Sequence, residues 1–152
     1  MTPSDSQQPS PGQVDPSQRC PCGTGDTYAA CCGRFHAGAA APTAEALMRS
    51  RYSANALLSA DPEYFGGYLH RTWAKETRPE LDDLRAAGPR WTRLAIMSTT
   101  AGGPFDSAGT VEFVATYQEG ATRGRLQELS RFRRESGTWL YIDGDIGDTH
   151  GM

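Results

Sequence analysis

All four cysteines of the chain lie within one short segment, as Cys20-x-Cys22, an eight-residue spacer and the adjacent pair Cys31-Cys32. Four thiolates suit a tetrahedral Zn²⁺ ion, with Zn–S bonds of about 2.3 Å. A segment this short has no core of its own, whereas zinc binding contributes on the order of 10–16 kcal/mol in zinc-finger peptides. The spacing therefore predicts one structural Zn²⁺ ion, held by all four cysteines in a closed shell.

The competing interpretation is a pair of disulfides, or unpaired thiols. Adjacent cysteines such as Cys31 and Cys32 rarely pair with each other. Crossed pairs that join these two to Cys20 and Cys22 are geometrically feasible. The N-terminal residues lack the apolar stretch of a signal peptide, and no apolar run approaches about 18 residues. We therefore expect a cytoplasmic protein without a membrane span, whose thiols stay reduced and favour a metal site.

The formal net charge of −3 argues against a general nucleic-acid binder, which would carry a basic stripe. Four ionised cysteines on one Zn²⁺ ion add −4 + 2 = −2 and make the chain more acidic still. A strongly acidic partner or an anionic membrane is therefore not expected.

The distribution of Pro, Gly and apolar residues predicts four regions. Residues 1–18 are rich in Pro, Ser and Gln and are expected to be disordered, because they have almost nothing to bury. Residues 19–36 form the predicted zinc knuckle, and residues 37–146 hold the apolar positions of one α+β domain. Residues 147–152 are expected to form a loose tail.

The first half of the predicted domain has the signals of helices. Thr43 is a suitable N-cap for a helix from Ala44 to about Ser59, and Asp61 is a suitable cap for a second helix that begins at Pro62. The sequence from Thr77 to Glu80 matches a capping box, which predicts a third helix carrying Leu81 and Leu84.

The second half changes to the period of strands. Strands are predicted over 91–99, 110–118, 125–134 and 138–143, and Ser136-Gly137 is a hairpin signal between the last two. Helices followed by a meander of strands predict an α+β fold, with the helices gathered on one side of an antiparallel sheet.

The cysteine segment resembles a known zinc-binding module. Its sequence CPCGTG at 20–25, the spacing and CCG at 31–33 resemble the SEC-C motif of the bacterial preprotein translocase motor. That motif has lysines after its Gly-rich turn, where this chain has Asp26, Thr27 and Tyr28. The resemblance therefore implies a zinc knuckle but not the docking of a chaperone on a basic knuckle surface.

The rest of the chain resembles the YchJ-like family of uncharacterised bacterial proteins. The strings that carry this resemblance are LMRSRYSA at 47–54, TW at 72–73, GTVEFVATY at 109–117, ELSRF at 128–132 and GTWLYIDG at 137–144. The family is similar in fold to nuclear transport factor 2, which implies helices on a curved antiparallel sheet that enclose a cone-shaped cavity. Relatives of this fold form homodimers through the sheet, so by analogy a homodimer is one expectation.

Three residues are candidates for acid–base chemistry. Glu128 shares a strand face with Ser130 and would act as a general base if it faced a cavity, or else would satisfy a buried arginine. His70 near Trp73 is a candidate acid–base residue or a structural histidine. Asp143 is a further candidate, although an Asp-Gly pair more often closes a turn.

Two arginines on the first predicted helix, Arg49 and Arg51, have two interpretations. They would hold an anion at the mouth of the cavity, or they would pair with Glu128 or Asp143 and pin the helix to the sheet. His36, just after the cysteines, is a further candidate ligand in place of Cys32.

These observations favour a binding or adaptor protein. The closed zinc site with four cysteine ligands suits a structural role, so the knuckle would dock on a protein or other macromolecule, and the α+β domain would hold a small-molecule ligand or a second copy of the chain. The alternative is a small-molecule enzyme of isomerase, dehydratase or hydrolase type. It would use Glu128, His70 or Asp143, and it requires an apolar cavity lined by at least one of them.

Overall fold

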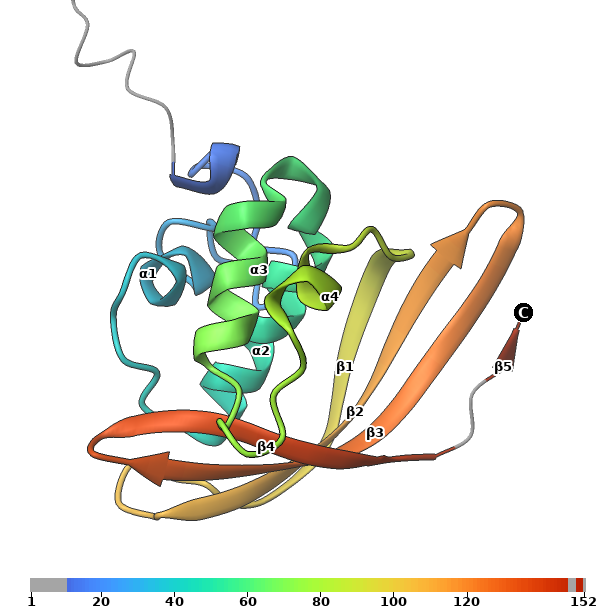
Figure 1. Cartoon of the computed structure of the whole chain (residues 1–152). Coiled ribbons are helices and arrows are strands. Elements are labelled where there is room, and N and C mark those ends of the chain that lie inside the picture. The colour runs from blue at the N-terminus through green and yellow to red at the C-terminus, as the bar shows by residue number, and fades with distance from the viewer. Residues whose placement is uncertain (1–10, 148–149, 152) are drawn as a thin grey trace, which may run out of the picture.

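The computed structural model describes residues 11–147 and 150–151 of the chain. The order of its elements is η2 (Pro11–Gln13), α1 (Cys32–His36), α2 (Ala44–Ala56), η3 (Leu58–Ala60), α3 (Pro62–Arg71), α4 (Leu81–Arg85), β1 (Arg90–Ala101), β2 (Ala108–Glu119), β3 (Thr122–Glu135), β4 (Thr138–Ile146) and β5 (His150–Gly151). The helices therefore precede the strands, as the α+β prediction requires, and they lie together on one side of the sheet (Figure 1).

The two longer helices begin at the predicted caps. The Thr43 side chain accepts a hydrogen bond from the backbone N–H of Ala46, and the Asp61 carboxylate accepts one from the backbone N–H of Tyr64. Each cap satisfies one backbone donor that the first helical turn leaves without a partner. α2 ends at Ala56, shortly before the predicted Ser59, and the chain continues as η3.

The predicted capping box at Thr77 is wrong. α4 begins after Glu80, which makes no side-chain cap, and α4 has only five residues. The Thr77 hydroxyl instead donates to the backbone carbonyl of Ile142 in β4, at 2.6 Å. The local sequence predicted that the Thr77 side chain would cap a helix, but a tertiary hydrogen bond uses this hydroxyl instead.

The sheet is antiparallel in the order β1-β2-β3-β4, with β5 also paired to β3. It curves strongly, so that β4 passes beneath the ends of the helices in Figure 1. β4 runs on to Ile146, beyond the predicted end at Asp143. Backbone hydrogen bonds from Ala74 to Tyr141 and from Tyr141 to Thr72 fasten the end of α3 to β4. The concave face of the sheet therefore closes over the helices.

The core lies between α2 and this concave face. β2 supplies Val111 and Ala115, which are buried as the predicted alternation requires. α2 supplies Leu47 and Met48, and Trp139 of β4 is 1% exposed. None of the helices within the described ranges is long and apolar enough to cross a membrane.

Residues 11–18 differ from the expected disorder. Val14 is buried, and the backbone carbonyls of Pro16 and Gln18 accept hydrogen bonds from Ala29 and Tyr28. The cysteine segment thus provides the partners that this polar stretch lacks on its own. The rest of the predicted disordered segment, residues 1–10, lies outside the described residues.

The predicted loose tail also differs where it is described. Gly147 donates a backbone hydrogen bond to Gln127, and β5 pairs with Gly124 and Arg125 of β3. Residues 148–149 and 152 of that tail lie outside the described part of the chain.

Candidate metal centre and ligand cavity

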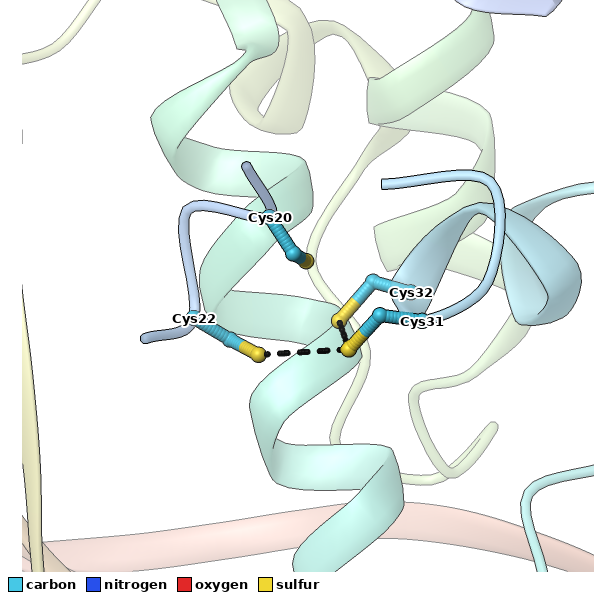
Figure 2. A group of neighbouring side chains, drawn as sticks. All are labelled: Cys20, Cys22, Cys31 and Cys32. Atoms are coloured by element: carbon cyan, nitrogen blue, oxygen red, sulfur yellow. Dashed lines mark hydrogen bonds between the residues drawn. The ribbon is translucent and has the colours of Figure 1, made fainter. Parts of the chain in front are cut away.

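The four cysteines converge beside α2. Cys20 and Cys22 come from the loop before α1, Cys31 and Cys32 stand at its start, and the four sulfur atoms point toward one another (Figure 2). All four are buried free thiols, and their Sγ atoms lie within 4.8 Å of one another. The described residues therefore contain no disulfide between these cysteines, and their arrangement fits either unpaired thiols or a metal site.

The spacing of the sulfur atoms fits a tetrahedral metal ion. The Sγ atom of Cys31 lies 3.6 Å from that of Cys22 and 4.0 Å from that of Cys32. Four sulfur atoms at about 2.3 Å from a central Zn²⁺ would be separated by about 3.8 Å. The donor set is also complete for a structural zinc site, because four protein ligands leave no open position.

Tight turns bring the two cysteine pairs together. Gly23, directly after Cys22, has a φ of 88°, a left-handed conformation that glycine adopts without steric cost. The backbone N–H of Gly33 donates to the carbonyl of Tyr28 at 2.8 Å, and a Cβ atom at Gly33 would lie 2.7 Å from that oxygen. Glycine at position 33 therefore allows the first turn of α1 to pack closely on the backbone of Tyr28.

Side chains around the sulfur atoms provide further hydrogen bonds. The hydroxyl of Ser53 in α2 donates to Cys32 Sγ at 3.3 Å and lies 3.5 Å from Cys20 Sγ. The hydroxyl of Thr24 lies 3.2 Å from Cys31 Sγ. Such donors orient ligands and stabilise negative charge on thiolates. Burial raises the pKa of the Cys31 thiol to about 11, so binding of a metal ion would release its proton at neutral pH.

His36 lies beside the metal centre but is committed to other partners. Its Nε2 donates to the backbone carbonyl of Ser50 at 2.8 Å, and its Nδ1 accepts from the hydroxyl of Tyr28. Burial lowers the pKa of His36 to about 4, so the ring is neutral at pH 7. Since both ring nitrogens are occupied, the structure gives no support to His36 as a ligand in place of Cys32.

A cavity of about 260 Å³ lies on the other side of α2, between this helix and the concave face of the sheet. Its lining combines six aromatic rings with a few polar groups. The lining residues are Met48, Arg51, Tyr52, Asn55, Trp73, Trp91, Phe113, Ala115, Leu126, Glu128, Ser130, Phe132 and Tyr141. The cavity that the enzyme alternative requires is therefore present, and Glu128 lines it.

Arg51 is a buried cation at this cavity. Its Nη1 donates to the backbone carbonyl of Leu69 at 2.9 Å and to the hydroxyl of Thr72 at 2.7 Å. Its guanidinium lies over the rings of Trp73 and Tyr141, 4.9 and 4.7 Å from their centroids. Burial lowers the pKa of Arg51 to about 10, which leaves the guanidinium charged at pH 7.

Glu128 is a buried anion in the same cavity. Its Oε2 accepts hydrogen bonds from the hydroxyls of Ser130 and Tyr141, each at 2.7 Å. Burial is the main cause that raises the pKa of Tyr141, and hydrogen bonding to Glu128 adds to it, so the phenol keeps the proton that it donates. Gly144 of β4 leaves room for this carboxylate, because a Cβ atom at Gly144 would overlap Glu128.

The other predicted site residues lie outside the cavity. Asp143 accepts a hydrogen bond from Arg131 at 2.7 Å, and both side chains are partly exposed. His70 is half-buried in the last turn of α3 and does not line the cavity. Arg49 bonds Glu45 and the backbone carbonyl of Cys22, so it supports the metal centre rather than pairing with Glu128 or Asp143.

Sequence reasoning missed two polar groups of the cavity. Asn55 lies one turn after Arg51 on α2 and lines the cavity, although nothing in its local pattern distinguishes it from a surface residue. The indole N–H of Trp73 is buried without a hydrogen-bond partner in the described part of the chain. The sequence indicated only that Trp73 follows Thr72 near the end of a predicted helix, and this position does not predict a cavity-lining role.

Comparisons of sequence match both parts of the structure. Residues 43–144 match the family model "YchJ, middle NTF2-like domain", and residues 17–34 match the SEC-C motif. A UPF0225 protein of Streptomyces coelicolor is 50% identical over 134 residues, which are 88% of this chain and 99% of the relative. A UPF0225 protein of Corynebacterium glutamicum is 51% identical over 130 residues, covering 85% and 98% of the two chains.

Two solved structures have similar folds. The solution structure of a SEC-C motif containing protein from Rhodopseudomonas palustris has a TM-score of 0.71 and 35% identity, and the match covers 85% of this chain and 98% of that one. The crystal structure of a SEC-C motif containing protein from Psychrobacter arcticus has a TM-score of 0.66, 24% identity and coverage of 93% and 84%. The second likeness concerns the fold alone.

Proposed function

This chain belongs to the UPF0225 family, in which a SEC-C motif precedes a YchJ-type NTF2-like domain, and from this premise we propose that it binds a small molecule in the cavity beside α2. A structural Zn²⁺ ion at the cysteine cluster holds α2 in place. The observation that carries the proposal is the cavity with its aromatic lining, which also includes Arg51 and Glu128.

The chemistry of the cysteine cluster supports zinc as the metal. Four thiolates in a tetrahedral arrangement favour Zn²⁺ or an iron–sulfur centre, and the short separation of the sulfur atoms leaves room for a single ion. All four ligands come from the chain, so the ion would serve the fold rather than activate a water molecule.

The lining of the cavity supports ligand binding. Sites for small molecules are concave and mostly apolar, with a small number of polar groups that orient the ligand. The volume of about 260 Å³ is slightly below the range of about 300–1,000 Å³ that is usual for such sites. The ligand is therefore a small one.

Native mass spectrometry of the purified chain tests both parts of the proposal. We expect one Zn²⁺ ion per chain and a small molecule that co-purifies in part of the sample. Ala115→Phe places a ring into the cavity and should remove the small molecule while retaining zinc, whereas Arg123→Ala, on the exposed part of β3, should retain both. A metal-free chain with disulfides, or a small molecule that survives Ala115→Phe, would contradict the proposal.

A second candidate function is catalysis by Glu128. Both hydrogen bonds that its carboxylate accepts fall on Oε2, and no side chain in the described ranges donates to Oε1, which is then free to accept a proton. In this case Glu128→Gln would abolish turnover of the ligand while the ligand still binds. Unchanged ligand after long incubation with the wild-type chain would favour binding alone.

We propose that the exposed turn of the knuckle, residues 23–26, is the surface that would contact a protein partner, and that a homodimer would form through the sheet. We also propose that the protein is cytoplasmic. Size-exclusion chromatography with light scattering tests the homodimer, which a monomer at micromolar concentration would contradict.

A further inference from the structure

We propose that the cavity selects a small, planar molecule with no net charge, which presents a hydrogen-bond acceptor and a donor on one edge, as an aromatic amide does. This inference rests on the proposed function, because it takes for granted that the cavity binds a ligand. It is carried by the charges, the unused hydrogen-bonding groups and the rings of the lining.

The charges of the lining sum to zero. Arg51 and Glu128 are the only charged residues among those that line the cavity, and no ion pair joins them in the described part of the chain. Tyr141 connects them, because the guanidinium lies over its ring and its hydroxyl donates to the carboxylate. A carboxylate ligand at Arg51 would face Glu128, and an ammonium ligand at Glu128 would face Arg51. A net charge on the ligand is therefore disfavoured in this apolar site.

Unused donors and an unused acceptor lie at the same cavity. The hydrogen bonds of Arg51 are both made by Nη1, so its Nε and Nη2 groups donate to no residue in the described part of the chain. These donors suit a carbonyl oxygen. Glu128 Oε1 accepts from no described side chain and suits an N–H group of the ligand. An amide carries both groups side by side.

The walls of the cavity suit a flat molecule. Six of the lining residues are aromatic, and two of them, Tyr52 and Trp91, meet edge to face with centroids 6.5 Å apart. Aromatic rings favour stacked or edge-on contact with another ring. With about 260 Å³ available, one or two fused rings with a short polar edge would fill the site.

Three isosteric probes test the charge of the ligand directly. Benzamide is neutral, benzoate is an anion and benzamidine is a cation at pH 7, and all three have one ring and one planar group. Titration calorimetry of the wild-type chain should give a dissociation constant for benzamide about tenfold lower than for either charged probe. Toluene, which lacks the polar edge, should bind more weakly than benzamide.

Substitutions at the two charges should change the preference in opposite directions. Glu128→Gln leaves a net positive cavity, so benzoate should become the preferred probe. Arg51→Met leaves a net negative cavity and should favour benzamidine. Because Arg51 also ties α2 to Leu69 and Thr72, Arg51→Lys serves as a milder variant that keeps the positive charge and removes the Nη2 donor. This variant should raise the dissociation constant of benzamide several-fold and leave that of toluene unchanged.

The outcomes separate this inference from the proposed function. The inference would be overturned if the wild-type chain bound benzoate or benzamidine most tightly, or if it bound benzamide and toluene equally. Either result would leave the proposal of ligand binding intact. Failure of all probes, beside a small molecule that co-purifies and is lost in Ala115→Phe, would also overturn only the inference. Failure of all probes without any such small molecule would overturn the proposed function as well.

Discussion

At the scale of single residues, burial decides which polar groups have a defined role. Glu128 and Arg51 are only 9% and 8% exposed, and each is held by hydrogen bonds to neighbouring groups. Asp143 and Arg49 were also candidate site residues in the sequence, but they form ion pairs with Arg131 and Glu45 on partly exposed side chains. The type of residue therefore identified candidates, and the surroundings separated them.

Gly144→Ala should destabilise the chain because the new methyl group overlaps the Glu128 carboxylate. We expect the free energy of unfolding in urea to fall by about 1–3 kcal/mol. In a Glu128→Ala background the same change should cost much less, since the overlap is gone. Gly67→Ala, where a Cβ atom meets open space on α3, is the control and should be neutral or stabilising. An equal cost of Gly144→Ala in both backgrounds would contradict this account.

The stability of the chain should decrease between pH 6.5 and pH 4 because of His36. Burial lowers its folded-state pKa to about 4, so in this range the unfolded chain binds a proton that the folded chain does not. The free energy of unfolding should therefore be highest above pH 6.5 and fall as the pH drops, by up to about 3 kcal/mol.

Urea titrations of the wild-type chain and of His36→Gln at pH 7 and pH 4.5 measure this effect. Protonation of the cysteine ligands affects both proteins, so the difference between their pH dependences belongs to His36. The wild-type chain should lose more stability than His36→Gln. Identical losses would show that His36 is not held in its neutral form.

At the scale of elements, α2 serves two sites with two faces. Ser50 and Ser53, three residues apart, face the region of the knuckle, where Ser53 contacts Cys32 and the backbone carbonyl of Ser50 accepts from His36. Met48, Tyr52 and Asn55 line the cavity from the opposite side. Residues three or four apart share a helix face, so one helix keeps the two sets separate.

Ser53→Ala should weaken metal binding without unfolding the chain. The Ser53 hydroxyl contacts Cys20 and Cys32, and loss of such an outer contact lowers metal affinity by about 10–100-fold. Competition with a chromophoric chelator measures the affinity for Zn²⁺. Ser59→Ala, an exposed position after α2, is the matched control and should not change it. Equal affinities of the two variants would contradict the role given to Ser53.

The sequence predicted elements well where the signals are local. Thr43 and Asp61 cap helices through backbone groups three residues away, and the alternation in β2 reflects its own two faces. It failed where the partner is distant in sequence, as with Thr77, whose hydroxyl reaches Ile142. The same reason applies to the two sites: the cysteine cluster follows from local spacing, whereas the cavity is lined by residues of α2 and of strands far along the chain.

At the scale of the whole molecule, the knuckle and the α+β domain share buried contacts, although the sequence suggested two regions joined near residue 36. Ser53 reaches the cysteines from α2, Arg49 donates to Cys22, and Arg71 of α3 donates to the backbone carbonyl of His36 at 3.0 Å. The metal centre thus lies against the helix that also presents Arg51 to the cavity. Our central claim is that the metal ion holds α2 in position and so supports the cavity.

Hydrogen–deuterium exchange of the zinc-loaded and zinc-stripped chain, followed in α2 (Ala44–Ala56) and in the β2–β3 hairpin, tests this claim most directly. The account predicts that removal of zinc strongly accelerates exchange in α2 and changes the hairpin much less, because the cysteines contact α2 and not the hairpin. Unchanged protection of α2 after complete removal of the metal would contradict it.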